Sequence, residues 1–194
     1  MREIEQRLVP TYPFYRHPIP KTKDEFDKNR MKRVEANDPV AMREMGSMRY
    51  DEGDYDGAFQ YLSKTAGLGD VAAHYSLSTM YRDGEGVEKD EKKEVYHLEQ
   101  AAIGGDPYAR NNIGCAEEDS GRLDRAVKHW IIAANLGNGL SLENVKEGFK
   151  MGLVSKIDFA AALRGHQAAI DATKSPQREA GELHYSQNSY FLNF

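Results

Sequence analysis

An internal repeat is the feature that most constrains this chain. At three places a glycine follows a pair of small residues, and the glycines lie 36 and 32 residues apart. The pairs and their glycines are Thr65-Ala66 with Gly69, Ala101-Ala102 with Gly105, and Ala133-Ala134 with Gly137. A period of roughly 20–50 residues is typical of solenoids, in which each repeat is one supersecondary unit. The spacing therefore predicts a stack of similar units.

The residues around each glycine predict that the unit is a pair of helices. A small residue stands four positions after the glycine and an apolar residue four positions later, which is the spacing of one helical face. The pairs are Ala73 with Leu77, Ala109 with Ile113 and Ser141 with Val145, and Ala41 with Met45 heads the first unit. A ring stands eight residues before each glycine, at Tyr61, His97 and His129. We expect these rings to pack between adjacent helix pairs.

Start and stop signals divide each unit in two. Asp38-Pro39 and Asp106-Pro107 each offer a capping carboxylate followed by proline at the first helical position. The three glycines suit a left-handed residue at the end of the second helix. One helix pair cannot bury its apolar face alone, so neighbouring units must supply the core.

The second unit, residues 73–105, resembles a Sel1-like repeat. Leu77, Tyr81, the run Gly84-Glu-Gly86-Val87, Asp90, Lys93 and the final alanine pair carry the resemblance, whereas Ser78, Glu94 and His97 depart from it. Units one and three have shorter turns and are more similar to tetratricopeptide repeats, and residues 138–173 read as a degenerate fourth unit. The resemblance implies an all-α, right-handed α-solenoid of about four helix pairs that acts as a scaffold or adaptor.

Two segments flank the predicted repeats. Four prolines lie between residues 10 and 20, and Thr22-x-x-Glu25 is a capping box that opens a helix to about Asn37. Beyond Pro176 we expect another short helix and an aromatic tail that docks either on this chain or on a partner. The predicted divisions are an N-terminal arm 1–23, a repeat domain 24–180 and a tail 181–194. The tail residues expected to dock are Tyr190, Phe191, Leu192 and Phe194.

Composition narrows the classes of partner and compartment. Residues 1–37 hold nine Lys/Arg against six Asp/Glu, so the remainder carries the acidic surplus of a chain whose net charge is −5. An acidic body argues against nucleic-acid binding. One cysteine, no signal-like segment and no apolar run of about 18 residues predict an intracellular protein without a transmembrane segment. The cytoplasm is the expected compartment, with the nucleus and organelles left open.

The segment from Tyr12 to Pro18 resembles the end of a RING finger, which some algal Sel1 proteins carry before their repeats. Tyrosines stand at both cysteine positions, Tyr12 and Tyr15. Zinc in such sites needs thiolate or imidazole ligands, so we predict no bound metal. The resemblance leaves one alternative function, a substrate-recruiting remnant of a RING-type ubiquitin ligase without its zinc module.

No local pattern predicts catalysis. The histidines form no H-E-x-x-H motif, and Gly84-x-Gly86 follows a helix rather than a strand. Cys115 lies inside a helix without a local partner, as a buried structural thiol does. We therefore expect a non-enzymatic protein without cofactors, either a scaffold or adaptor that binds other proteins or a structural subunit of a larger assembly.

Two surfaces are candidates for binding a partner. In the tetratricopeptide register, residues flanking the core positions of each first helix line a groove. The groove residues are Arg43, Ser47, Tyr50, Tyr75, Thr79, Arg82, Tyr108 and Asn111. The turns within the units gather acid, and stacking would align them as an acidic ridge that steers a basic partner. The ridge residues are Asp54, Asp56, Asp83, Glu85, Glu88 and Asp90.

Overall fold

The computed structural model describes residues 22–174, which form nine α-helices and no strand. Most of these helices are 13 residues long. In chain order they are α1 Lys23–Glu35, α2 Pro39–Asp51, α3 Tyr55–Gly67, α4 Val71–Asp83, α5 Glu91–Ile103, α6 Pro107–Asp119, α7 Leu123–Asn135, α8 Gly139–Lys150 and α9 Lys156–Thr173.

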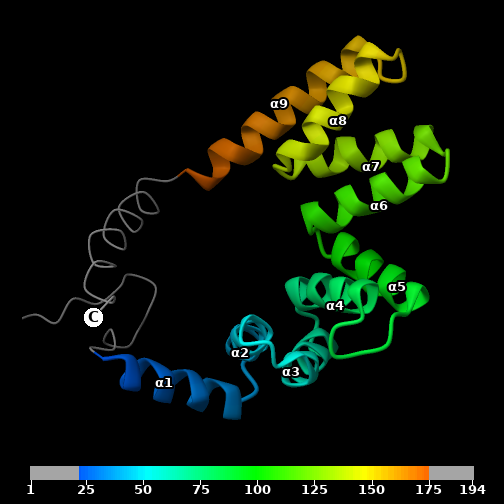
Figure 1. Ribbon diagram of the computed structural model, residues 1–194. Coiled ribbons are helices and arrows are strands. Elements are labelled where there is room, and N and C mark those ends of the chain that lie inside the picture. Colours follow the sequence, from blue (N-terminus) through cyan, green and yellow to red (C-terminus); the bar gives the residue numbers. More distant parts are fainter. Residues whose placement is uncertain (1–21, 175–194) are drawn as a thin grey trace, which may run out of the picture.

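The helices stack in the order of the sequence. Four pairs, α2–α3, α4–α5, α6–α7 and α8–α9, follow one another along an arc with α1 at one end (Figure 1). Each helix packs against its neighbours in the chain, and α9 also reaches back to α7. The predicted all-α solenoid of four helix pairs is confirmed for the described residues.

Each joint between pairs is built by the same three-residue device. At the first joint Gly69 has a φ of +86°, and its N–H donates to the carbonyl of Ala66 at 2.8 Å. The N–H of Asp70 donates to the carbonyl of Thr65 at 3.3 Å, which completes a Schellman motif. The side chain of Asp70 then accepts from the N–H of Ala73 and caps α4. One residue thus closes one helix and opens the next.

The other joints repeat this geometry. Gly105 and Gly137 have φ values of +91° and +93°, and Asp106 and Asn138 cap the helices that follow. At the end of α1 the left-handed position is taken by Asn37, with a φ of +56°. Asparagine tolerates this conformation better than most residues. The repeat anchors predicted from the sequence are therefore the joints of the solenoid.

The predicted core positions lie inside. Met45, Leu77 and Val145 are buried, and Ile113 is half-buried against the cluster around Leu98. Gly46 of α2 and Gly114 of α6 allow these helices to pack closely on α3 and α7. A Cβ added to Gly114 would lie 2.5 Å from Nε1 of the buried Trp130 indole.

The N-terminal helix begins where the capping box predicts. The N–H of Glu25 donates to Oγ1 of Thr22 at 3.2 Å, and α1 ends at Glu35, two residues earlier than expected. The arm before Thr22, the helix expected beyond Pro176 and the aromatic tail lie outside the described residues, so the three-part division of the chain stays a prediction.

We predict that Gly114→Ala lowers the free energy of unfolding by about 1–3 kcal/mol, because the new methyl group collides with a buried indole. Gly67→Ala is the control, since nothing lies within 4 Å of a Cβ there and alanine favours helix. Urea unfolding measures both. Equal stability of Gly114→Ala and the unchanged chain would show that the two helices can separate without cost.

Candidate partner-binding surfaces

The predicted groove residues lie on α2, α4 and α6, but only three of them are exposed. Ser47, Arg82 and Tyr108 face solvent, and the Tyr108 side chain is 57% exposed. Arg82 donates two hydrogen bonds to its neighbour Asp83, at 3.0 and 3.1 Å. These three side chains are available to a partner.

Three more groove residues are tied to the fold. Nε of Arg43 donates to Asp70 at 3.2 Å, which links α2 to the cap of α4. The hydroxyl of Tyr50 donates to Glu85, and its ring packs on the core cluster around Leu77. The hydroxyl of Thr79 bonds the carbonyl of Ser76 in its own helix. Partner binding at these positions would compete with existing contacts.

Asn111 and Tyr75 differ from the expectation of an open groove. Asn111 is only 8% exposed, and its Oδ1 accepts a 2.7 Å hydrogen bond from Ser141 of α8. Tyr75 is half-buried against the cluster around Leu98, with its ring centroid 6.3 Å from that of Tyr108. Asn111 is therefore a core residue that joins two units, and the half-buried Tyr75 ring packs beside the exposed ring of Tyr108.

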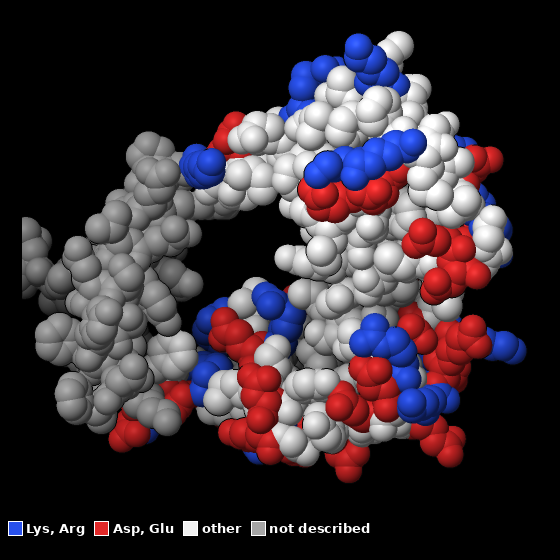
Figure 2. All heavy atoms as spheres, turned by 45° about the horizontal axis from the view of Figure 1, so that its top comes forward, with Lys and Arg blue, Asp and Glu red and all other residues white. Residues whose placement is uncertain are grey.

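The acidic surplus is concentrated in two of the helix pairs. Residues 38–106 hold 15 Asp/Glu against 7 Lys/Arg, whereas residues 107–194 hold ten of each. Carboxylates gather in the lower half of the view in Figure 2, where α2–α5 lie. The negative charge of the repeat region is thus concentrated on the first two pairs.

The predicted ridge residues divide into structural and free carboxylates. Asp54 and Asp90 cap α3 and α5, and Asp83 pairs with Arg82. Asp56 and Glu88 are exposed and make no hydrogen bond or ion pair within the described residues, as is also true of Asp51, the last residue of α2. All of these residues add negative charge, but the carboxylates of Asp54, Asp83 and Asp90 also stabilise the fold.

The first two turns lie against each other. Glu85, in the α4–α5 turn, accepts from Tyr50 of α2, and the Tyr50 and Tyr55 rings meet edge-on at 5.1 Å. A Cβ at Gly86 would lie 2.5 Å from the carbonyl oxygen of Tyr55. The Glu85 hydrogen bond, followed by burial, raises the pKa of Tyr50 to about 12. We call the edge formed by these turns, residues 51–56 and 83–91, the acidic edge.

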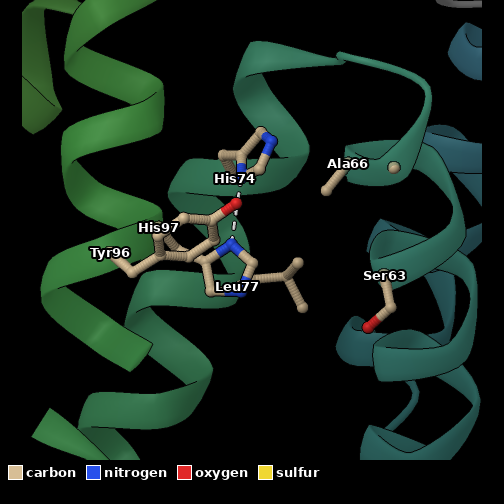
Figure 3. Close-up of a pocket in the computed structure, with 7 residues that line it drawn as sticks. Ser63, Ala66, His74, Leu77, Tyr96 and His97 are labelled. Carbon is tan, nitrogen blue, oxygen red and sulfur yellow. Dashed lines mark hydrogen bonds between the residues drawn. The ribbon is translucent and has the colours of Figure 1, made fainter. Parts of the chain in front are cut away.

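A pocket that sequence reasoning missed opens between α3, α4 and α5. Its volume is about 400 Å³, and Figure 3 shows the imidazoles of His74 and His97 in contact on one side of it, opposite Ser63 and Ala66. Their Nδ1 atoms lie 2.9 Å apart, and the His97 ring stacks on Tyr81 with centroids 5.6 Å apart. The remaining lining residues are Ser63, Ala66, Gly67, Leu77 and Tyr96.

Burial, then the facing His74 and then Lys93 lower the pKa of His97 to about 4. The His97 ring is therefore neutral at physiological pH, and it shares a hydrogen bond with the His74 ring. None of the seven residues that line the pocket is a carboxylate or a thiol. Among the described residues, no three His, Cys, Asp or Glu side chains are grouped as metal ligands.

The fold and these surfaces define an α-solenoid with an acidic edge. The Sel1 repeat model matches residues 39–70, 71–106 and 120–138, so the chain contains Sel1 repeats. The first two matches cover α2–α3 and α4–α5, and the third covers α7. Unit one is therefore a Sel1 repeat despite its shortened turn. The joints that begin at Gly69, Gly105 and Gly137 end the matched segments.

Solved structures show the same fold. The Sel1 repeat protein from Oxalobacter formigenes is 23% identical, with a TM-score of 0.62 over 84% of this chain and 69% of that protein. A protective antigen of uropathogenic Escherichia coli strains, described as having an SLR fold, is 22% identical, with a TM-score of 0.57 over 79% of this chain and 34% of its own. No curated protein sequence matches the chain.

The resemblance of residues 12–18 to a RING finger stays a prediction, because this segment lies outside the described residues and the matched repeats begin at residue 39. Within residues 22–174 no helix combines the length and apolar character needed to cross a bilayer.

We predict that stability falls as the pH is lowered from 6.5 toward 4. His97 has a depressed pKa in the folded state, so the unfolded chain binds more protons in this window. One such proton gives a slope of at most about 1.4 kcal/mol per pH unit. Burial also lowers the pKa of His129, which adds a slope of the same sign. Urea unfolding at several pH values measures the dependence.

The variant His97→Tyr keeps a ring on Tyr81 and removes the titrating group. Its stability should depend less steeply on pH between 5 and 6.5, with the contribution of His129 remaining. An unchanged slope in this variant would exclude His97 as the titrating group.

Proposed function

We propose that this chain is a non-enzymatic scaffold that binds a basic segment of a partner protein across its first two helix pairs. The observation that carries the proposal is the confinement of the acidic surplus to residues 38–106. Sel1 repeats serve in general as scaffolds for protein–protein interaction, and their fold is typically non-catalytic. Both findings favour a binding role over a chemical one.

The proposed surface extends from the acidic edge to Tyr108. Asp51 of α2 and Asp56 of α3 supply exposed charge at one end, and Ser47 of α2 and Arg82 of α4 are exposed beside the same turns. At the other end, Val40, Tyr108 and Leu140 are exposed and are each the second residue of their helix. Exposed aromatic residues beside polar ones are enriched in protein interfaces.

The partner's chemistry follows from this arrangement. Lys or Arg side chains would meet the acidic edge, and an apolar or aromatic residue would rest on Tyr108, which Tyr75 supports. Acidic surfaces mainly increase the rate of association and weaken with salt. The proposed complex therefore forms faster at low ionic strength, and its apolar contact carries the affinity that remains in high salt.

We predict that Asp51→Asn/Asp56→Asn weakens binding roughly 3- to 10-fold at low salt, since each exposed charge pair contributes about 0.2–1 kcal/mol. Stability should hardly change, because the two effects on the helix dipoles cancel. The negative charge of Asp51 is unfavourable at the C-terminus of α2, whereas that of Asp56 is favourable in the first turn of α3. Pull-down with the full chain and mass spectrometry identify a partner, and calorimetry with its basic segment measures the affinity.

The matched control is Glu118→Gln/Asp119→Asn, two exposed acids at the end of α6, outside residues 38–106. This variant should bind like the unchanged chain. If both double variants lose affinity equally, net charge rather than the acidic edge attracts the partner. If neither does, the proposed surface is wrong.

We predict that Tyr108→Ala weakens binding by about 1–2 kcal/mol at unchanged melting temperature, because the side chain is exposed. Tyr75→Ala should instead lower the free energy of unfolding by roughly 2 kcal/mol, since its ring covers the cluster around Leu98. Thermal melts and calorimetry on both variants separate the effects. A loss of stability in Tyr108→Ala with full binding would contradict the proposal.

A further inference from the structure

The outward face of α9 carries an apolar stripe, flanked by the exposed Arg164 and Asp171, that no described residue covers. The inner side of this helix buries Ala162 and bonds His166 to the carbonyl of Ala134. The opposite side carries a stripe at i, i+4, i+11 and i+15, which is one face of a helix. The stripe residues are Ile157, Ala161, Ala168 and Ala172, all exposed, with Ile157 79% exposed.

The position of α9 makes this face unusual for the molecule. The second helix of every earlier pair is covered by the first helix of the next: α3 by α4, α5 by α6 and α7 by α8. Among the described residues nothing follows α9. The apolar surface also continues onto the preceding turn, where Met151 and Leu153 are exposed. The end of a solenoid needs a cap because its last unit has lost a neighbour.

The sequence that follows α9 has the features of such a cap. Ser175-Pro176 offers a capping hydroxyl followed by proline, as the carboxylate and proline do at the starts of α2 and α6. Apolar residues then recur at helical spacing, at Ala180, Leu183, Tyr190, Phe191 and Phe194. As a helix, residues 176–194 would be about 28 Å long, against about 27 Å for α9.

We propose that residues 176–194 return antiparallel along α9 of the same chain and cover its outward stripe. Lys174 has the extended φ and ψ of −86° and 107°. Two residues of sequence, Lys174 and Ser175, separate α9 from Pro176, which is a length that can join antiparallel helices. Residues equally distant from this connection then lie side by side. Leu183 then falls within one helical turn of Ala168, and Phe191 and Phe194 fall on either side of Ile157.

The pairing matches side chains by size. The alanines of the stripe let the returning helix approach closely near the connection, and the aromatic end meets the bulky Ile157 together with Met151 and Leu153. The tail is thereby assigned to this chain, which leaves the acidic edge and Tyr108 for the partner.

The test uses Ile157→Ser and Phe191→Ser in the full chain, alone and together. If the tail covers Ile157, each change lowers the melting temperature by about 3–6 °C, because a buried apolar side chain becomes polar. The double variant should lose less than the two losses added together. The matched control is Ile103→Ser, an isoleucine 75% exposed at the end of α5, which should melt like the unchanged chain.

Two results would overturn the proposal. One is an Ile157→Ser variant as harmless as Ile103→Ser, or losses that simply add. The other is a dimer in light scattering that Phe191→Ser converts to a monomer, which would assign the tail to a second copy. Neither measurement needs a partner, so failure here is distinguishable from failure of the proposed function.

Discussion

The hydrogen bonds at the joint between one helix pair and the next are the constraint on which the rest of this structure depends. A left-handed glycine turns the chain, and the next residue gives its N–H to the ending helix and its side chain to the beginning one. The joint contains no additional residues, so its backbone conformation is the same each time, with a φ of +86° to +93° at Gly69, Gly105 and Gly137. Repetition of one angle produces the arc of Figure 1.

The arc explains where surface chemistry accumulates. Apolar side chains are buried between the helix pairs, so charged side chains lie along the edges of the stack. At one edge the first two turns contact each other through Tyr50, Glu85 and Tyr55. The last pair has no described successor, so Ile157 and its neighbours stay uncovered on α9. An acidic edge at one end and an apolar face at the other follow from the same stacking rule, and they suit different occupants.

The periodicity of the sequence predicted which face of each helix is buried in the core. It did not predict which of the remaining polar residues are exposed and which form contacts with another helix. Met45, Leu77 and Val145 are buried as their spacing requires. Asn111 is buried too, because Ser141, 30 residues away, supplies its hydrogen bond. Tyr50 meets Glu85 across 35 residues, and His74 meets His97 across 23. A spacing rule describes one helix at a time, so it cannot identify a partner that stands on another.

The sequence by itself therefore determined the unit of this protein: its length, its caps, its left-handed glycines and its apolar stripe, because each depends on residues a few positions apart. Only the tertiary structure decided which polar side chains join units and which face solvent, since that depends on the angle between pairs. The sequence pattern predicted that both Arg43 and Arg82 line the groove. The structure commits Arg43 to the cap of α4 and leaves Arg82 exposed beside Asp83.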